Sequence, residues 1–237
     1  MQLNAMSVRR RGAASVKSCE YSELVAKRKK CSLCPGLTNP SRVQGGEFDS
    51  EHIGPYSQWQ GSLTPDVVVV AKDFAPVSKF VEYGGKPGPR VRTNRRLRQF
   101  LETVGYSAGA PDAPDNAPLF FTNAVLCLPG GESMRTAVPD SAVRTCGSEF
   151  LAPLLQLLSP RAVVALGAKA TTALFAALRL QQPASFAELV QGSGLALPSG
   201  ATFFACPHPA AALPNAEHKA AWARVAQHAT QQAPTAD

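Results

Sequence analysis

The stretch Pro118-Leu-Phe-Phe-Thr-Asn-Ala-Val-Leu-Cys-Leu-Pro129 joins a run of apolar residues to two residues that carry chemistry, Asn123 and Cys127. The run stops at Pro129-Gly130-Gly131, so it predicts a buried strand that leads into a loop. In an open parallel sheet, ligands bind just beyond the carboxyl ends of the strands. This stretch therefore predicts an amide and a thiol near the ligand-binding edge of a sheet.

The rest of the chain alternates between strand-like and helix-like patterns. Three further apolar runs predict strands at residues 66–71, 161–166 and 201–206. Helical patterns follow at residues 93–104, 140–158, 168–180 and 217–227. This alternation predicts an α/β fold, a three-layer α/β/α sandwich around a central four-stranded parallel sheet. The Gly- and Pro-rich stretches at 35–64 and 77–91 are predicted to be loops.

Length and charge predict one domain with an anionic partner. We place this domain at residues 19–228, between a basic, disordered arm at 1–18 and a disordered tail at 229–237. The net charge of +7 suits nucleic acid, although it also fits a protein that is simply basic. No apolar run reaches the length of a membrane span, and we find no secretory core. We therefore expect an intracellular, cytoplasmic monomer without a membrane partner.

Six cysteines in a chain of this kind favour metal binding or catalysis over disulfides. Cys31 and Cys34 form a C-x-x-C, and Cys127 and Cys146 lie far downstream, on either side of one loop. Four thiolates can hold a [4Fe–4S] cluster or a zinc ion, and their spacing does not choose between the two. The sequence therefore predicts a metal site without naming the metal.

Three polar residues lie at or just past the carboxyl ends of predicted strands: Asp73, Asn123 and His208. Because these ends share one edge of a parallel sheet, the three side chains can meet in a single pocket. Such a trio suits cleavage of an N-glycosidic bond. A carboxylate stabilises the sugar cation or orients water, an imidazole stabilises the departing base, and an amide both donates to and accepts from a pyrimidine edge.

At this point the sequence resembles the uracil-DNA glycosylase superfamily, and most closely its iron–sulfur branch, often called family four. The resemblance spans about residues 31–225. It is carried by Cys31-x-x-Cys34, by Thr122-Asn123-Ala-Val-Leu-Cys127-Leu-Pro129, by Cys146 with Val164-Ala165-Leu166-Gly167-Ala168-Lys169-Ala170 after it, and by His208-Pro209-Ala210. The first motif is atypical. The branch has G-E-A-P-G after its first strand, whereas this chain has Ala71-Lys72-Asp73-Phe74-Ala75.

The resemblance implies a role for each matching residue. Asn123 would read the uracil edge, His208 would stabilise the leaving uracil anion, and Asp73 would activate water or stabilise the sugar cation. Lys72 and Phe74 match neither family pattern, but their position beside Asp73 places them in the expected substrate site, with Phe74 preferred over Phe80 or Tyr83 for stacking on the base. The implied cofactor is a structural [4Fe–4S] cluster, and its ligands would be Cys31, Cys34, Cys127 and Cys146.

The implied partner is DNA containing uracil or another deaminated base, flipped out of the helix. Leu213 would press into the duplex, and the residues expected to contact DNA phosphates are Arg90, Arg92, Arg95 and Arg135. Two alternatives stay open. One is a glycosylase with a shifted preference for other deaminated bases, and the other is a catalytically inactive iron–sulfur DNA-binding protein.

Overall fold

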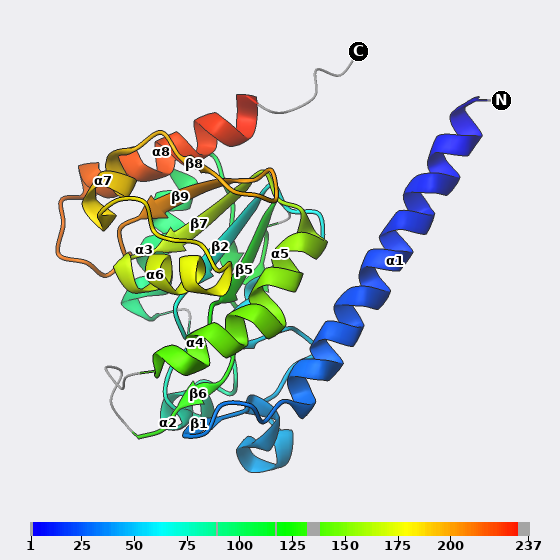
Figure 1. The fold of residues 1–237 in the computed structure, drawn as a ribbon, viewed down its shortest axis with the longest axis vertical. Coiled ribbons are helices and arrows are strands. Elements are labelled where there is room, and N and C mark those ends of the chain that lie inside the picture. Colours follow the sequence, from blue (N-terminus) through cyan, green and yellow to red (C-terminus); the bar gives the residue numbers. More distant parts are fainter. Residues whose placement is uncertain (1, 89, 117, 132–137, 232–237) are drawn as a thin grey trace.

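The centre of the fold is a five-stranded sheet in a computed structural model that describes residues 2–88, 90–116, 118–131 and 138–231 (Figure 1). The strand order is β5-β2-β7-β9-β8. The strands are β2 (Val67–Ala71), β5 (Leu119–Asn123), β7 (Ala162–Leu166), β8 (Leu195–Ala196) and β9 (Thr202–Cys206). The first four in this order are parallel, whereas β8 runs antiparallel to β9.

The predicted α/β fold and its four parallel strands are confirmed, and the sheet gains one strand that the sequence did not predict. The extra strand, β8, has only two residues and lacks an apolar run. Gly194, just before it, adopts φ +106, and a Cβ there would lie 2.5 Å from Thr202 Cγ2. A glycine at this position therefore allows the chain to turn back closely along β9.

Helices cover both faces of the sheet, which gives the predicted three layers (Figure 1). On one face, Val68, Val70 and Phe120 pack against apolar residues of the helices that follow β6 and β7. These helices are α4 (Asp140–Cys146), a π-helical turn (Gly147–Leu151), α5 (Ala152–Leu158) and α6 (Ala168–Ala177). On the other face, Val67 and Val69 pack against α3 (Arg92–Glu102) and α8 (Asn215–Gln231).

The amino-terminal segment differs most from expectation. Residues 1–18 are predicted to be a disordered arm, but α1 (Gln2–Lys30) is helical from Gln2 onward. The stretch has no proline and only one glycine, Gly12, so its composition permits one long helix. At the other end, α8 includes residues 229–231 of the predicted tail.

Short elements lie in the segments between the main strands and helices. Those before β2 are β1 (Leu37–Thr38) and two 3₁₀ segments, Pro40–Gly46 and Pro55–Trp59. Those after it are α2 (Val77–Glu82), β3 (Gly109–Ala110), β4 (Ala113–Pro114), β6 (Leu128–Pro129) and α7 (Phe186–Gln191). No helix in the described part of the chain has the length and apolar character of a membrane span.

Candidate active site

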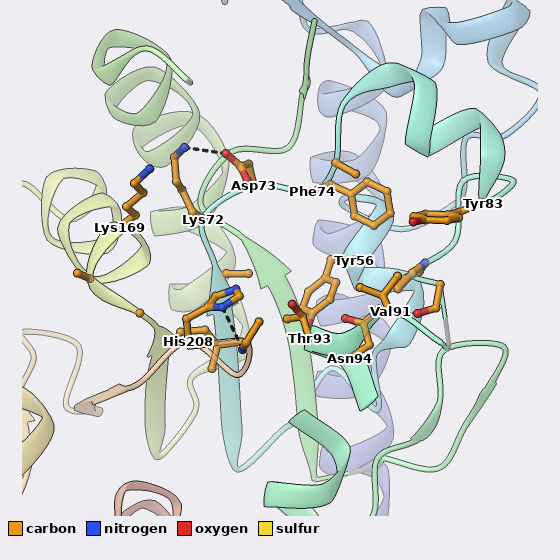
Figure 2. A pocket seen from close by; sticks show the side chains of 18 residues that line it. Tyr56, Lys72, Asp73, Phe74, Tyr83, Val91, Thr93, Asn94, Lys169 and His208 are labelled. Atoms are coloured by element: carbon orange, nitrogen blue, oxygen red, sulfur yellow. Dashed lines mark hydrogen bonds and ion pairs between the residues drawn. The ribbon is translucent and has the colours of Figure 1, made fainter. Parts of the chain in front are cut away.

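A cavity of about 650 Å³ opens at the carboxyl ends of the parallel strands. Asp73 reaches it from the turn after β2, Gly167 from the turn after β7, and His208 from the segment after β9 (Figure 2). Strand ends that lie far apart in the sequence therefore contribute to one pocket, as the parallel topology predicts. Its remaining wall comes from the loop before β2 and from the segment that leads into α3.

Asp73 forms an ion pair with the residue before it. The Nζ atom of Lys72 lies 2.8 Å from Oδ2 of Asp73, and the two side chains are about one-fifth exposed, at 20% and 22%. The backbone here is held by the neighbouring strand, because the N–H of Val125 donates to the carbonyl of Lys72 (2.9 Å). The turn after β2 therefore presents a carboxylate whose Oδ2 faces an ammonium group.

His208 is held in a defined tautomer. The backbone N–H of Ala210 donates to Nδ1 of His208 at 3.2 Å, so Nδ1 is the acceptor and a neutral ring carries its proton on Nε2. The ring is exposed at the pocket, yet partial loss of water lowers its pKa, an effect that the nearby Asp73 opposes. The arrangement therefore favours a neutral imidazole that can donate from Nε2.

The turn after β7 passes close to this histidine. Gly167 has φ +88, and a Cβ at this position would lie 2.9 Å from Cβ of His208. Only a residue without a side chain allows the turn and the histidine to approach this closely. Gly167 therefore fixes how near the start of α6 lies to His208.

Asn123 is a buried amide beside the pocket rather than in its wall. Its side chain is 2% exposed, and neither Oδ1 nor Nδ2 has a hydrogen-bond partner among the described residues. Asn123 is in register with Ala71 on β2, and Ala71 lines the pocket, so both side chains lie on the same face of the sheet. Buried amides are almost always hydrogen-bonded, so this one is available to a ligand.

Aromatic residues line the other side of the cavity. Phe74 and Tyr83 both line it, whereas Phe80 is fully buried behind Phe74 with the two ring centroids 6.1 Å apart. Tyr56, which the sequence did not single out, also lines the pocket and has a buried hydroxyl without a partner among the described residues. It lies in a 3₁₀ segment within a predicted loop, where no periodicity marks it.

Further lining residues were also missed. Thr93 and Asn94 come from α3, and Lys169 comes from the first turn of α6. Figure 2 places Lys169 with Lys72 on one side of the pocket, and Asn94 on the other. Lys169 lies within a motif quoted above, Val164-Ala165-Leu166-Gly167-Ala168-Lys169-Ala170, although the sequence analysis assigned it no role.

The predicted DNA-contacting residues lie on the surface. Arg90, Arg92 and Arg95 are exposed, and none forms an ion pair within the described ranges. Leu213, in the loop after His208, is 40% exposed. Arg135 lies outside the described residues.

One arginine in the same basic run has a structural role instead. Nη1 of Arg96 donates to the carbonyl of Ala211 (3.1 Å) and Nη2 to Oδ1 of Asn215 (2.9 Å). Arg96 therefore ties α3 to the loop that contains the exposed Leu213.

The four predicted metal ligands gather at one end of α1. Cys127 and Cys146 are 9% and 4% exposed, and Cys31 and Cys34 are half-buried against the same core. Burial raises the pKa of Cys127 to about 12, and the thiols of Cys34 and Cys31 add to this effect. Within the described ranges, no group of three or more His, Cys, Asp or Glu side chains is arranged to hold a metal ion. The cofactor and its metal ligands therefore stay predictions.

A buried arginine organises the segment around the C-x-x-C. Nη1 of Arg28 lies 2.7 Å from Oδ1 of Asp49, and its Nη2 donates to the carbonyls of Ser50 and His52. Nδ2 of Asn39 donates to the carbonyls of Arg28 (2.7 Å) and Cys31 (2.9 Å). The segment that carries two of the four cysteines is therefore fixed by hydrogen bonds of its own.

Comparison with known proteins gives one result. Residues 74–228, more than half of the chain, match the sequence model of the Uracil DNA glycosylase superfamily. The matched range contains Asn123 and His208, begins one residue after Asp73, and does not include the C-x-x-C. No curated protein matches the sequence.

Proposed function

The chain belongs to the uracil DNA glycosylase superfamily, and on this premise we propose that it hydrolyses the N-glycosidic bond of uracil flipped out of DNA. Membership supports a DNA glycosylase, and the choice of uracil is the proposal. The observation that carries it is the convergence of Asp73 and His208 in one cavity, beside the Asn123 amide, which has no hydrogen-bond partner among the described residues. In this proposal Asp73 acts on the sugar, His208 on the leaving base, and Asn123 on the edge of the base.

His208 acts on the leaving base. When the glycosidic bond breaks, negative charge develops on the carbonyl oxygens of uracil. A neutral imidazole whose Nδ1 accepts from Ala210 can donate from Nε2 to such an oxygen. Because the donor is already oriented before the bond breaks, its hydrogen bond strengthens as the charge develops.

Asp73 acts on the sugar. Lys72 holds its Oδ2, so Oδ1 is the oxygen that faces the sugar or orients the attacking water. A carboxylate near the sugar carbon stabilises the positive charge that appears there as the base leaves. The ion pair holds the carboxylate in place for this task.

Asn123 and Phe74 recognise the base. The amide of Asn123 can donate to O4 of uracil and accept from its N3–H, which would supply the two partners that the amide does not find in the described part of the chain. Phe74 offers an aromatic face in the pocket wall. Flipping the nucleotide costs a few kcal/mol, which contacts of Leu213 with the duplex and of Arg90, Arg92 and Arg95 with phosphates would offset.

We further propose that Cys31, Cys34, Cys127 and Cys146 hold a [4Fe–4S] cluster. A set of four thiols without carboxylates or imidazoles fits an iron–sulfur cluster or zinc. The cluster, when bound, would supply a structural tie between the segment after α1 and the loop after β5. Burial raises the pKa of the Cys127 and Cys146 thiols, so a metal that binds there would have to displace their protons.

The assigned roles are tested by separating catalysis from binding. In Asp73→Ala and His208→Ala, single-turnover release of uracil should fall by roughly 10² to 10⁴-fold. Binding to an oligonucleotide that carries a baseless site should stay within about threefold, a change of less than 0.7 kcal/mol. The matched control is Asp66→Asn, which removes a carboxylate from the opposite end of β2, where Asp66 lies 3.6 Å from Arg161. Native rates in the Asp73 and His208 variants would refute these roles.

A further inference from the structure

The pocket has two ends of different chemistry. Figure 2 places Phe74, Tyr83 and Tyr56 on one side, and Lys72 and Lys169 on the other, with Asp73 and His208 on the lysine side of the aromatic rings. A cavity of about 650 Å³ lies in the range that encloses drug-sized ligands, and a free pyrimidine is much smaller than these. The cavity therefore has room for more of the nucleotide than its base.

The two lysines differ in what balances their charge. Lys72 lies 2.8 Å from Oδ2 of Asp73, so within the pocket its positive charge is offset by a carboxylate. Lys169 forms no ion pair with any residue that the structure describes. Its side chain is exposed and lines the cavity from the first turn of α6. Lys169 therefore supplies the uncompensated positive charge at this end of the pocket.

We propose that Lys169 binds a phosphodiester group that flanks the flipped nucleotide. One unpaired ammonium matches the single negative charge of a phosphodiester. With the base against the aromatic residues, the rest of the nucleotide would extend towards the opposite side of the pocket, which carries Lys169. The proposal rests on the proposed function and deepens it by giving the nucleotide an orientation. Its base points towards Phe74 and Tyr56, and its phosphate points towards Lys169.

This assignment separates two kinds of phosphate contact. Arg90, Arg92 and Arg95 are exposed on the segment that leads into and forms the start of α3, so they meet phosphates outside the pocket. Lys169 lines the pocket itself, close to the turn at Gly167 that passes His208. Loss of Lys169 should therefore affect the phosphate next to the target nucleotide, whereas loss of a surface arginine should affect a phosphate farther along the strand.

The test pairs a charge-removing variant with charge-removing changes in the DNA. Single-stranded oligonucleotides carry a baseless site and one neutral methylphosphonate, placed in turn at each phosphate near that site. Binding is measured for native protein, Lys169→Gln and Arg179→Asn. Arg179 is the control because it lies just past the other end of α6, about 15 Å from Lys169 along the helix. Asparagine is the replacement because it tolerates the positive φ of 55° at this position.

For the native protein, one methylphosphonate position next to the baseless site should weaken binding by about fivefold, the upper range for an exposed charge pair. In Lys169→Gln that position should have almost no effect, and the slope of log K against log salt should be smaller by about 0.7. Arg179→Asn should behave as the native protein does, and Lys169→Arg should keep the native slope.

Equal methylphosphonate effects in native protein and Lys169→Gln would overturn the proposal, as would equal salt slopes in Lys169→Gln and Arg179→Asn. Because the target site in these oligonucleotides already lacks its base, these results do not depend on catalysis. If the native protein releases no uracil but the methylphosphonate effect is lost in Lys169→Gln, the proposed function is refuted and the phosphate site stands. If the native protein releases uracil but Lys169→Gln keeps the methylphosphonate effect, the phosphate site is refuted and the proposed function stands.

Discussion

Replacing Asn123 by alanine should separate the function of this residue from its contribution to stability. In the folded protein, its two amide atoms are buried without partners among the described residues, and each such group costs about 1–3 kcal/mol. If uracil bonds to both amide atoms, the transition state no longer carries this cost, a gain of about 2–6 kcal/mol. Asn123→Ala has no amide and cannot make this gain. Uracil release, as kcat/KM, should therefore fall by roughly 30- to 20,000-fold.

The same substitution should leave stability unchanged or raise it. Alanine removes two desolvated polar groups, and this gain offsets the packing that the shorter side chain loses. The matched control is Thr122→Val on the same strand. Thr122 is fully buried with an unpartnered hydroxyl among the described residues, but it is in register with Val70 and faces away from the pocket. It should gain stability without any loss of activity.

The assay combines urea unfolding with single-turnover release of uracil, measured for native protein and both variants. The reasoning predicts a large loss of activity with no loss of stability in Asn123→Ala, and native activity with a gain of stability in Thr122→Val. A variant Asn123→Ala that loses several kcal/mol of stability would show that the amide is satisfied within the fold. Retention of native kcat/KM would show that the amide does not read the base.

Three further outcomes are expected. Base release should fall as the pH drops below about 6.5, through the lowered pKa of His208. The reason is that a proton on Nδ1 of His208 breaks the hydrogen bond from the N–H of Ala210. A flat pH–rate profile between about pH 6.5 and 5 would contradict this. Cys146→Ala should lower the iron content of anaerobically purified protein, whereas Cys206→Ala, another buried thiol, should not; equal iron content in the two variants would refute the assignment of Cys146 as a ligand. Thermal stability should decrease from about pH 7 to 5. Burial, and after it the charge of Arg96, lowers the pKa of His218 in the folded protein. At low pH the unfolded chain therefore binds a proton that the folded protein excludes. His218→Phe should flatten this dependence while keeping a ring against Phe100, where the centroids are 4.5 Å apart; an unchanged slope would exclude His218 as its source.

The core of the fold is predictable because buried parallel strands leave a plain signal. Val67–Ala71 is apolar throughout, and Leu119–Asn123 has three apolar residues before Thr122 and Asn123, so both the strands and the ligand-binding edge follow from the sequence. The two-residue β8 has no such run and depends on a glycine turn and on the neighbouring β9. Its pairing is a tertiary effect that local pattern does not contain.

The site was predictable where chemistry coincides with a strand end, as at Asp73 and His208. Tyr56 and Lys169 reach the same cavity from a 3₁₀ segment and from the first turn of a helix, where nothing in the spacing marks them. Arg95 and Arg96 are neighbours in one basic run, yet Arg95 is exposed and Arg96 bonds to the loop after His208. Only the packing of α3 against that loop distinguishes them.

The most direct test of the central claim is base release by the native protein. Single- and double-stranded oligonucleotides with uracil, hypoxanthine or xanthine are incubated with purified protein, and alkaline cleavage reveals abasic sites. The account predicts abasic sites at uracil. Abasic sites only at a purine would keep the glycosylase and overturn the role of Asn123 as the reader of uracil. No abasic sites with any substrate, from a folded protein that binds DNA, would contradict the proposed activity.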